Sequence, residues 1–258
     1  MIILGKSRTN TFYSITFYCA KINPKRLKLM PINGIIGVSE NERGAKAMLQ
    51  QKINYHKMLT AEILRLKSQG VTPRLLLQCC CAPCSSYVLE YLDKSFDITP
   101  YFYNPNISPE SEYDKRANEL SRLVCEMPLN TVNAPIIEQY DNAEFEAAVK
   151  GLENEPEGGA RCAVCYRLRL EKAAQYAKAN GFDYFCTTLS ISPLKNSQTL
   201  NQIGKAVSER YGVKYLFSDF KKNEGFKRSV ILCTDYGLYR QNYCGCKYSK
   251  AQNAEKTT

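Results

Sequence analysis

The sequence has very little histidine and no long apolar run. His56 is the only histidine among the 258 residues, which excludes a catalytic centre built from several imidazoles. No stretch approaches the roughly 18 to 20 unbroken apolar residues that cross a bilayer. With 14 glycines and 11 prolines, the chain is neither collagenous nor of low complexity. We therefore expect one principal globular domain outside the membrane.

The charge of the chain is strongly positive. Lysine and arginine number 35 against 25 acidic residues, for a formal net charge of +10. A surplus of this sign favours polyanionic partners such as RNA. Charge alone is weak evidence, because many basic proteins bind no nucleic acid.

Both ends of the chain look different from its centre. Residues 1–36 contain six basic residues and no acid, and they show no helical period. The apolar stretch 15–20 lacks a small-residue cleavage pattern, so a secretory signal is disfavoured. We expect residues 1–39 to be a basic, poorly structured extension and residues 251–258 a flexible tail. An organellar presequence and translation from an upstream start codon remain open alternatives for the extension.

Residues 40–250 alternate short apolar strands with longer helices. Strands are expected at 74–79, 98–104, 129–134, 184–189 and 214–219, and helices at 40–69, 85–93, 109–127, 142–152, 165–180, 197–211 and 225–236. Repeated strand–helix–strand units form right-handed crossovers and hence a mostly parallel sheet. The pattern predicts a single doubly wound α/β domain, Rossmann-like or HUP-like, with helices on both faces.

Cysteine is abundant and clustered. Eight of the 12 cysteines fall into three groups: Cys79, Cys80, Cys81 and Cys84; Cys162 and Cys165; Cys244 and Cys246. A secreted disulfide scaffold spaces its cysteines to staple a small domain, whereas adjacent thiols in a chain of this length favour metal ligands or redox thiols. We therefore expect a reducing compartment, the cytoplasm.

The first group lies where a buried strand ends and a helix begins. Cys79 continues the strand, so we expect it to pack in the core. Cys80, Cys81 and Cys84 follow at the end of the sheet where doubly wound proteins bind ligands. The amino terminus of a helix lowers thiol pKa values and attracts anionic thiolates. These three thiols are the first candidate metal site, at the carboxyl ends of the strands.

The other two groups allow more than one chemistry. Cys162 and Cys165 form a CxxC motif, which fits an iron or zinc site or a thioredoxin-like dithiol, although a glycine-rich stretch rather than a strand precedes it. Cys244 and Cys246 flank Gly245, and a disulfide across so short a loop is strained and easily reduced. We favour a redox pair there, with zinc ligation as the alternative.

Together the groups hold more thiols than one tetrahedral zinc ion can take. Iron–sulfur clusters are bound by cysteine thiolates. Two thiols from the first group and two from the CxxC would hold a 4Fe-4S cluster and leave Cys84 and the CxC pair for chemistry on a substrate. A zinc-stabilised RNA-binding module and a dithiol oxidoreductase remain the alternative functions.

The motifs occur in a specific order. They are LLL at 75–77, CCAPCS at 80–85, YFYNPNI at 101–107 with EY at 112–113, RC and CY within 161–166 with RL at 169–170, TTLSISP at 187–193, DFKK at 219–222, YRQ at 239–241 and YCGC at 243–246. In this combination the sequence resembles the cobalamin-independent epoxyqueuosine reductases, the QueH family, over roughly residues 53–250. The resemblance implies an oxidoreductase that removes the epoxide oxygen of epoxyqueuosine at the tRNA wobble position by two-electron reduction.

The resemblance also implies roles for the cysteines. The positions that match cluster ligands of the family are Cys80, Cys81, Cys162 and Cys165. Those that match a redox-active disulfide are Cys244 and Cys246. An additional iron is associated with the family, and Cys84 is its candidate ligand here. Gln78 stands where the family often carries histidine, so no acid–base role is transferred to it.

The implied partners are tRNA and an electron donor that the sequence does not identify. Basic and aromatic residues beside the cysteine motifs are suited to phosphates and unpaired bases of the anticodon arm. The candidates are Arg161, Tyr166, Arg169, Lys221, Lys222 and Arg240. For each one, a solvated charge or a core aromatic ring is the ordinary alternative.

Overall fold

The computed structural model describes residues 53–255. The basic extension expected at 1–39, and the part of the first predicted helix before residue 53, lie outside these described residues. No helix in the described range is long and apolar enough to cross a membrane.

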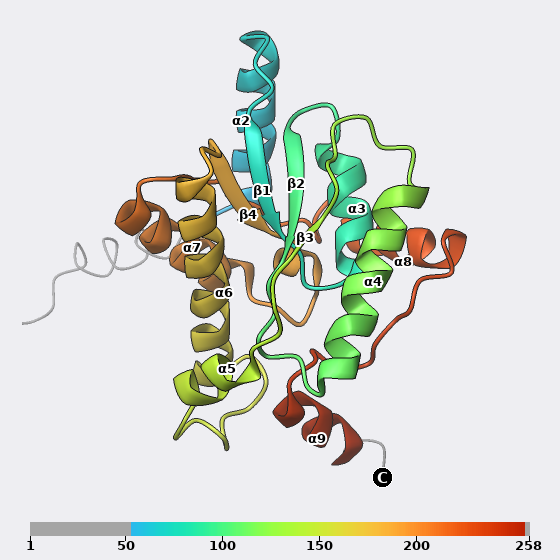
Figure 1. Ribbon diagram of the computed structural model, residues 1–258. Coiled ribbons are helices and arrows are strands. Elements are labelled where there is room, and N and C mark those ends of the chain that lie inside the picture. Colours follow the sequence, from blue (N-terminus) through green and yellow to red (C-terminus); the bar gives the residue numbers. More distant parts are fainter. Residues whose placement is uncertain (1–52, 256–258) are drawn as a thin grey trace, which may run out of the picture. The chain divides into compact units, whose positions relative to one another are not determined.

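A parallel sheet forms the centre of the described domain (Figure 1). Its strands are β1 (Arg74–Gln78), β2 (Asp97–Phe102), β3 (Ile136–Ile137), β4 (Tyr184–Thr187) and β5 (Lys214–Tyr215), in the order β3-β2-β1-β4-β5. In register, Leu76 of β1 lies opposite Thr99 of β2 and Phe185 of β4. The predicted α/β class with a doubly wound parallel sheet is confirmed.

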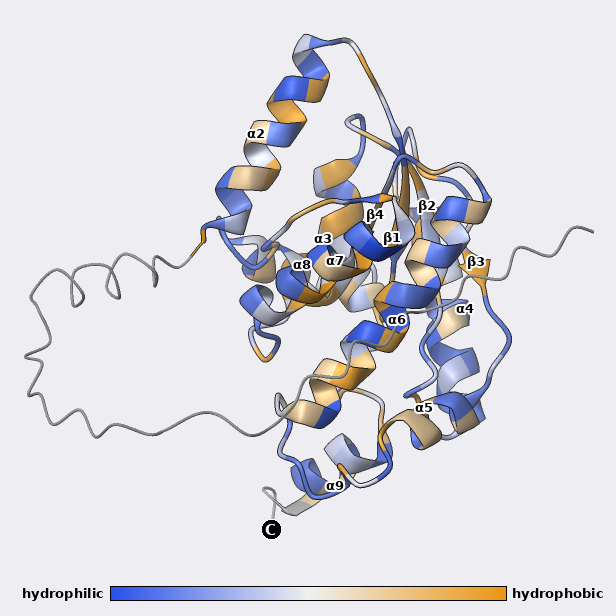
Figure 2. Ribbon diagram, turned by 90° about the vertical axis from the view of Figure 1, so that its left-hand side faces the viewer, coloured by the Kyte–Doolittle hydropathy of each residue, from blue (hydrophilic) through white to orange (hydrophobic). Residues whose placement is uncertain are grey.

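Helices cover both faces of this sheet. The helices are α2 (Tyr55–Ser68), α3 (Ala82–Leu92), α4 (Glu110–Glu126), α5 (Asn142–Ala148), α6 (Ala160–Ala179), α7 (Ser197–Tyr211), α8 (Gly225–Asp235) and α9 (Lys247–Glu255). Figure 1 shows α6 and α7 on one side of the strands and α3, α4 and α8 on the other. Hydrophobic residues concentrate in the strands and α3, whereas hydrophobic and hydrophilic residues alternate along α4 and α6 (Figure 2).

The leucines of β1 build the core on both faces. Leu75, Leu76 and Leu77 are fully buried. Leu75 and Leu77 pack with residues of α3 and α4, while Leu76 packs with residues of α6. This division follows from the two-residue period of a strand. Each buried leucine stabilises the fold by about 1.5–3 kcal/mol, so β1 is a firm base for the loop that follows it.

The predicted strand 129–134 is wrong. Only an isolated bridge joins Val132 to Ile98, and the third strand is Ile136–Ile137. The Asn133 side chain donates hydrogen bonds to the Asp97 side chain and the Ile98 carbonyl. Pro135 follows and has no N–H for a ladder. Regular pairing with β2 therefore begins after Pro135, at Ile136.

Two helices differ from expectation near the cysteines. Helix α6 begins at Ala160 rather than at 165, so the CxxC lies within its first two turns. Helix α9 occupies Lys247–Glu255, where residues from 251 onward were expected to form a flexible tail. Helix α6 therefore holds both cysteines of the CxxC, and α9 begins directly after Cys246.

The sheet order creates a crevice between β1 and β4. The chain leaves β1 toward β2 on one side, and β4 and β5 add to the opposite side. In doubly wound folds, ligands bind at this reversal, outside the carboxyl ends of the strands. The short helix η1 (Thr188–Ile191) follows β4 directly. The Cys80 amide donates a 3.3 Å hydrogen bond to Thr188 Oγ1, so the loops after β1 and β4 meet there.

Candidate metal centre and adjoining cavities

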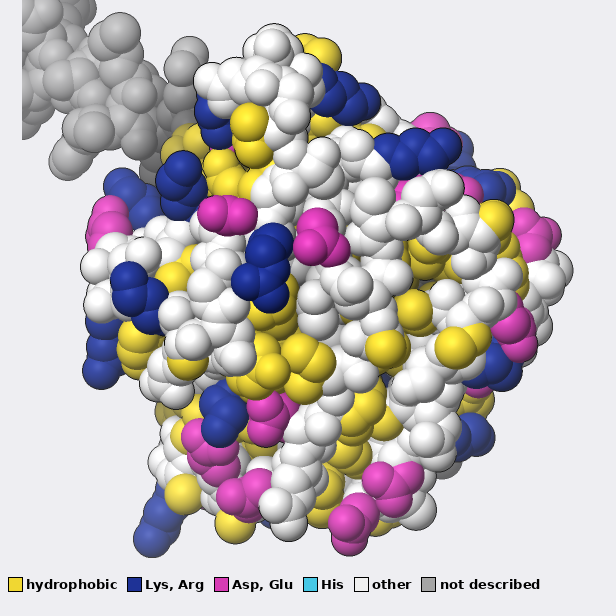
Figure 3. All heavy atoms as spheres, turned by 45° about the horizontal axis from the view of Figure 1, so that its top comes forward, with side chains coloured by type: hydrophobic (Ala, Val, Ile, Leu, Met, Phe, Trp, Pro, Cys, Tyr) yellow, Lys and Arg dark blue, Asp and Glu magenta, His cyan; other side chains and the backbone are white. Residues whose placement is uncertain are grey.

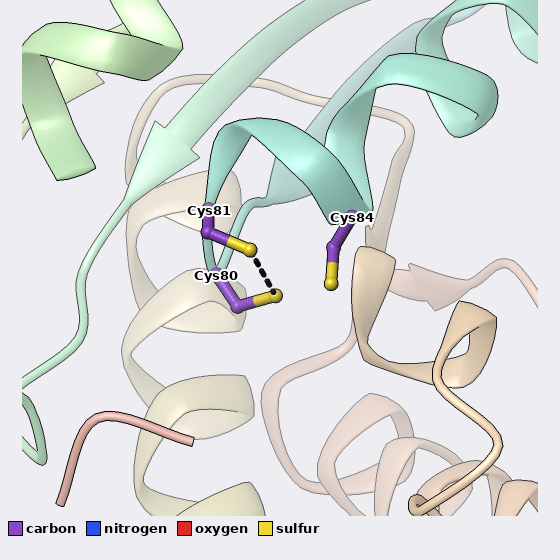
Figure 4. Close-up of side chains that lie close together, drawn as sticks. All are labelled: Cys80, Cys81 and Cys84. Carbon is purple, nitrogen blue, oxygen red and sulfur yellow. Dashed lines mark hydrogen bonds between the residues drawn. The ribbon is translucent and has the colours of Figure 1, made fainter. Parts of the chain in front are cut away.

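Three thiols converge at the end of β1. The sulfurs of Cys80, Cys81 and Cys84 all lie within 4.8 Å of one another, and those of Cys80 and Cys81 are 3.8 Å apart. Figure 4 shows the three side chains directed into one space from the loop and from the first turn of α3. Within residues 53–255 this is the group of cysteine, histidine and acidic side chains that is close enough to share one metal ion. A cysteine-rich site able to bind a metal is therefore present.

The local backbone explains this convergence. Cys81 is the N-cap of α3 with extended backbone, and Pro83 follows in the first helical turn, where its fixed φ favours helix initiation. The pKa of Cys80 lies well below its usual value because Cys81 and Cys84 donate hydrogen bonds to its sulfur. By contrast, burial raises the pKa of Cys79 to about 12. Cys79 is fully buried among core residues, as expected.

A second thiol group lies where α6 approaches the segment before α9. Cys162 and Cys165 share one face of α6 because residues three apart are neighbours on a helix. Cys165 packs with Cys246 and Phe145. Burial raises the pKa of Cys165 to about 12, so this thiol stays protonated near neutrality unless a metal or cation stabilises its thiolate. The CxxC and the CxC therefore meet, whereas the predicted cluster combines the CxxC with two thiols of the first group.

The two thiol groups face adjoining cavities. Cys80, Cys81 and Cys84 line the first cavity, and Cys162, Cys165 and Cys246 line the second. Cys244 and Glu157 line both. The structure thus separates the predicted cluster ligands into a trio at β1 and a pair on α6, with Cys244 between them.

Buried positive charge surrounds the thiols. Arg169 is 1% exposed and donates hydrogen bonds to the Cys165 carbonyl and to Asn104 Oδ1, each at 3.3 Å. Burial lowers its pKa, but the thiols of Cys165, Cys244 and Cys80 outweigh this effect and raise it. No ion pair joins Arg169 to a carboxylate within residues 53–255. A cation without a carboxylate between two sets of thiols suits an anionic thiolate–metal centre.

Unpaired buried polar atoms at the same place support this fit. In the described part of the chain they include Arg169 Nη2, Arg116 Nη2, Tyr166 Oη and Asn106 Oδ1. Buried polar groups without hydrogen-bond partners are rare in native proteins, and each one needs an explanation such as a bound ion or ligand. The unpaired donors of Arg169, Arg116 and Tyr166, together with the thiols, therefore fit a bound metal or other anionic group.

Gln78 and Asn104 hold the strand ends that carry the site. Thr187 Oγ1 of β4 donates a 2.8 Å hydrogen bond to Gln78 Oε1, and Gln78 Nε2 donates to the Tyr103 carbonyl and Asn104 Oδ1. The Asn104 amide donates to the Cys79 carbonyl. Gln78, fully buried, therefore acts here as a structural link between β1, β2 and β4.

Gly245 allows the CxC turn. Its φ of +116° is a conformation that other residues rarely adopt. A Cβ at this position would lie 2.9 Å from Ile107 Cγ1 and 3.0 Å from Arg116 Nη1. Both the backbone and the packing thus require glycine between Cys244 and Cys246, which are both free thiols here.

Of the residues expected to contact RNA, three are buried and three are exposed or partly exposed. Arg161, Tyr166 and Arg169 are 1%, 3% and 1% exposed. These three cannot contact phosphates at the surface, and they line the second cavity instead. Lys222 and Arg240 are exposed.

Lys221 is partly exposed and pairs with Asp219 at 2.7 Å. On the face seen in Figure 3, basic and acidic side chains are interspersed rather than gathered into one basic patch. That face therefore offers no single polyanion-binding surface.

Several polar residues of the first cavity were missed in the sequence. Lys195 and Arg116 are nearly buried cations, and both line the cavity with the thiol trio. Glu157 lies in the glycine-rich stretch before the CxxC and lines both cavities. Lys195 follows η1, just beyond the end of β4. A lysine at that place in the sequence could have been recognised as a candidate residue of the site.

The parallel sheet and the thiol-lined crevice at its reversal point define a Rossmann-like protein with a cysteine-rich metal site. Comparison with known proteins narrows this class. The model of the family described as "Epoxyqueuosine reductase QueH" matches residues 75–252. The chain belongs to this family of oxidoreductases, as its motifs predicted.

Individual relatives carry the same name. The chain is 49% identical to the epoxyqueuosine reductase QueH of Streptococcus pyogenes over 201 residues, which cover 77% of this chain and 79% of the relative. It is 46% identical to that of Staphylococcus epidermidis over 209 residues, 78% and 87% of the two chains. It is 38% identical to that of Thermotoga maritima over 186 residues, 70% and 93%.

Proposed function

We propose that the protein reduces epoxyqueuosine to queuosine at the wobble position of tRNA. Two electrons and two protons convert the epoxide into an alkene and water. The observation that carries the proposal is the trio of thiols at the reversal point of the sheet, in a chain whose relatives bear this enzyme name. The crevice is where a doubly wound fold receives a ligand.

The proposed cofactor is a 4Fe-4S cluster held by Cys80, Cys81, Cys162 and Cys165. Its support is that these thiols line two adjoining cavities and that Arg169 interacts electrostatically with both Cys80 and Cys165. Cys84, whose sulfur lies close to those of Cys80 and Cys81, is proposed to hold an additional iron. When bound, these metals supply electrons and a Lewis acid for the oxygen that leaves.

Cys244 and Cys246 are proposed to form the redox-active pair. The support is that Cys244 lines both cavities, and so borders the spaces next to all four proposed cluster ligands. Oxidation of this dithiol to a disulfide releases two electrons, the number that the epoxide needs. An external electron donor then restores the thiols, and free thiols at so many positions accord with a reducing, cytoplasmic environment.

Lys221, Lys222 and Arg240 are proposed to contact tRNA. Arg240 lines a further cavity that shares Cys81 and Cys84 with the first one. A phosphate contact there would hold the anticodon arm beside the thiols. The proposed catalytic domain is residues 40–250.

The decisive experiment uses the intact chain, purified without oxygen, and tRNA that carries epoxyqueuosine. With a strong one-electron reductant, mass spectrometry of the digested tRNA should show a nucleoside lighter by one oxygen atom. A Cys125→Ala variant is the matched control, because Cys125 is exposed and lies outside both cavities. Unchanged epoxyqueuosine with iron-loaded protein would refute the assigned reaction.

A further inference from the structure

Lys195 is a nearly buried cation on the wall of the first thiol cavity. It is 6% exposed, and the turn after η1 fixes its backbone through a 3.2 Å hydrogen bond from its amide to the Ser192 carbonyl. The cavity that it lines also contains Cys80, Cys84 and Cys244. A lysine is seldom buried without a specific partner or purpose.

Glu157 connects Lys195 to the CxC segment. Lys195 Nζ lies 2.9 Å from Glu157 Oε1, and the other carboxylate oxygen accepts a 3.1 Å hydrogen bond from Ser249 Oγ. Ser249 Oγ in turn accepts a 3.1 Å hydrogen bond from the Cys244 amide. The amide of Ser249 donates to Cys246 Sγ at 3.3 Å. The ammonium group is thus held in a fixed relation to the proposed redox pair.

The other proton-bearing side chains of this cavity are less suitable donors. Arg116 pairs with Glu112 at 2.7 Å and donates to the Cys244 carbonyl, and a guanidinium does not release its proton in proteins. Tyr243 is already engaged in a cation–π contact, because the Arg116 guanidinium carbon lies 5.1 Å from the centre of its ring. The thiols are engaged by the proposed metal and redox chemistry.

The charge state of Lys195 suits a donor that acts late in the reaction. Burial lowers its pKa, but Cys244, Tyr166 and Glu157 outweigh burial and raise it. The amine is therefore protonated when substrate arrives. The same rise makes the ammonium a weaker acid, so it donates only to a strongly basic oxygen such as the alkoxide that forms as the carbon–oxygen bond breaks.

We propose that Lys195 is the catalytic acid that protonates the epoxide oxygen, and that Glu157 is its positioning residue. The inference rests on the proposed function. Both carbon–oxygen bonds break and one carbon–carbon π bond forms, with two electrons from the Cys244–Cys246 dithiol, which becomes a disulfide and releases its two protons to solvent. The oxygen leaves as water with one proton from Lys195 Nζ and one from solvent, and the neutral amine then regains a proton from solvent.

The test measures single turnovers of the reduced protein with saturating epoxyqueuosine tRNA. Lys195→Met should slow turnover at least about 100-fold, the lower range for loss of a general acid, while iron content and tRNA affinity stay within twofold of wild type. Lys195→Arg should keep both binding properties but recover little rate. Tyr243→Phe, at the competing position in the same cavity, should retain most of the rate.

Chemical rescue separates catalysis from structure. Small primary amines should restore turnover to Lys195→Ala in proportion to their concentration, which a merely structural lysine would not permit. Glu157→Gln should lower the rate less than Lys195→Met does, with tRNA affinity unchanged.

Four results would overturn the inference: full turnover by Lys195→Met, weaker tRNA binding at an unchanged rate, loss of iron from that variant, or failure of amine rescue. An iron-loaded wild type that leaves epoxyqueuosine intact would refute the proposed function itself. An active wild type combined with any of the four results would refute only the role of Lys195.

Discussion

Replacing Arg169 with methionine should change the stability of the metal-free protein and its affinity for iron in opposite directions. In the metal-free protein Arg169 is buried without a carboxylate partner, and the neighbouring Cys165 thiol is neutral near pH 7 because burial raises its pKa to about 12. With metal bound, the same guanidinium faces ligated thiolates and compensates their charge. Methionine keeps much of the volume and removes the charge.

The magnitudes follow from the contacts. The two hydrogen bonds of Arg169 are both 3.3 Å long, and Asn104 Oδ1 keeps its hydrogen bond from Gln78. Exchanging a buried ion for a well-packed apolar side chain is often neutral or stabilising by about 1–4 kcal/mol, so the metal-free variant should unfold at equal or higher urea. A lost hydrogen bond to a charged group costs about 1.5–3 kcal/mol. At about 1.4 kcal/mol per factor of ten, iron binding should weaken about 10- to 100-fold.

Two assays with one control test this prediction. Urea unfolding followed by circular dichroism measures the metal-free proteins, and competition with an iron chelator measures metal retention. Arg167→Met is the matched control, because Arg167 is exposed on the same helix, and it should behave like wild type in both assays. A variant at Arg169 that retains iron as well as wild type, or that is destabilised by several kcal/mol without metal, would refute the reasoning.

Three further substitutions test other parts of the site. Cys162→Ala should lose cluster iron and its brown colour, measured by absorbance against the exposed Cys125→Ala control; equal iron in both would exclude Cys162 as a ligand. Cys246→Ala should keep the colour but lose most turnover, and full activity in the deoxygenation assay would remove the CxC pair from the mechanism. Gly245→Ala should lower the free energy of unfolding by about 1–3 kcal/mol, because its Cβ would meet Ile107 at 2.9 Å in a positive-φ conformation; an unchanged urea midpoint would contradict that analysis.

The fold was predictable where local pattern and long-range packing agree. The run Leu75 to Leu77 reads as a buried strand, and its alternate side chains do pack on opposite faces of the sheet. Where individual residues interrupt the pattern, the prediction was wrong. Pro135 and the side chain of Asn133 delay pairing with β2 until Ile136, although the preceding residues are apolar enough to suggest a strand.

The sequence was sufficient to predict the cysteines of the candidate site, but not its buried charged residues. Cysteines have few alternative uses when clustered, so Cys80, Cys81 and Cys84 could be placed at the end of β1 from the sequence. Lys195 and Glu157 are 38 residues apart and become partners only through the tertiary fold. Likewise, the burial of Arg169 follows from the packing of α6, because a single arginine on a helix is ordinarily solvated.

The content of iron and acid-labile sulfide, measured in protein purified without oxygen, tests the central claim most directly. We predict brown protein with about four iron and four sulfide per chain, any additional iron raising only the first number, and loss of both from Cys162→Ala. Colourless protein that contains zinc and no sulfide would contradict the account.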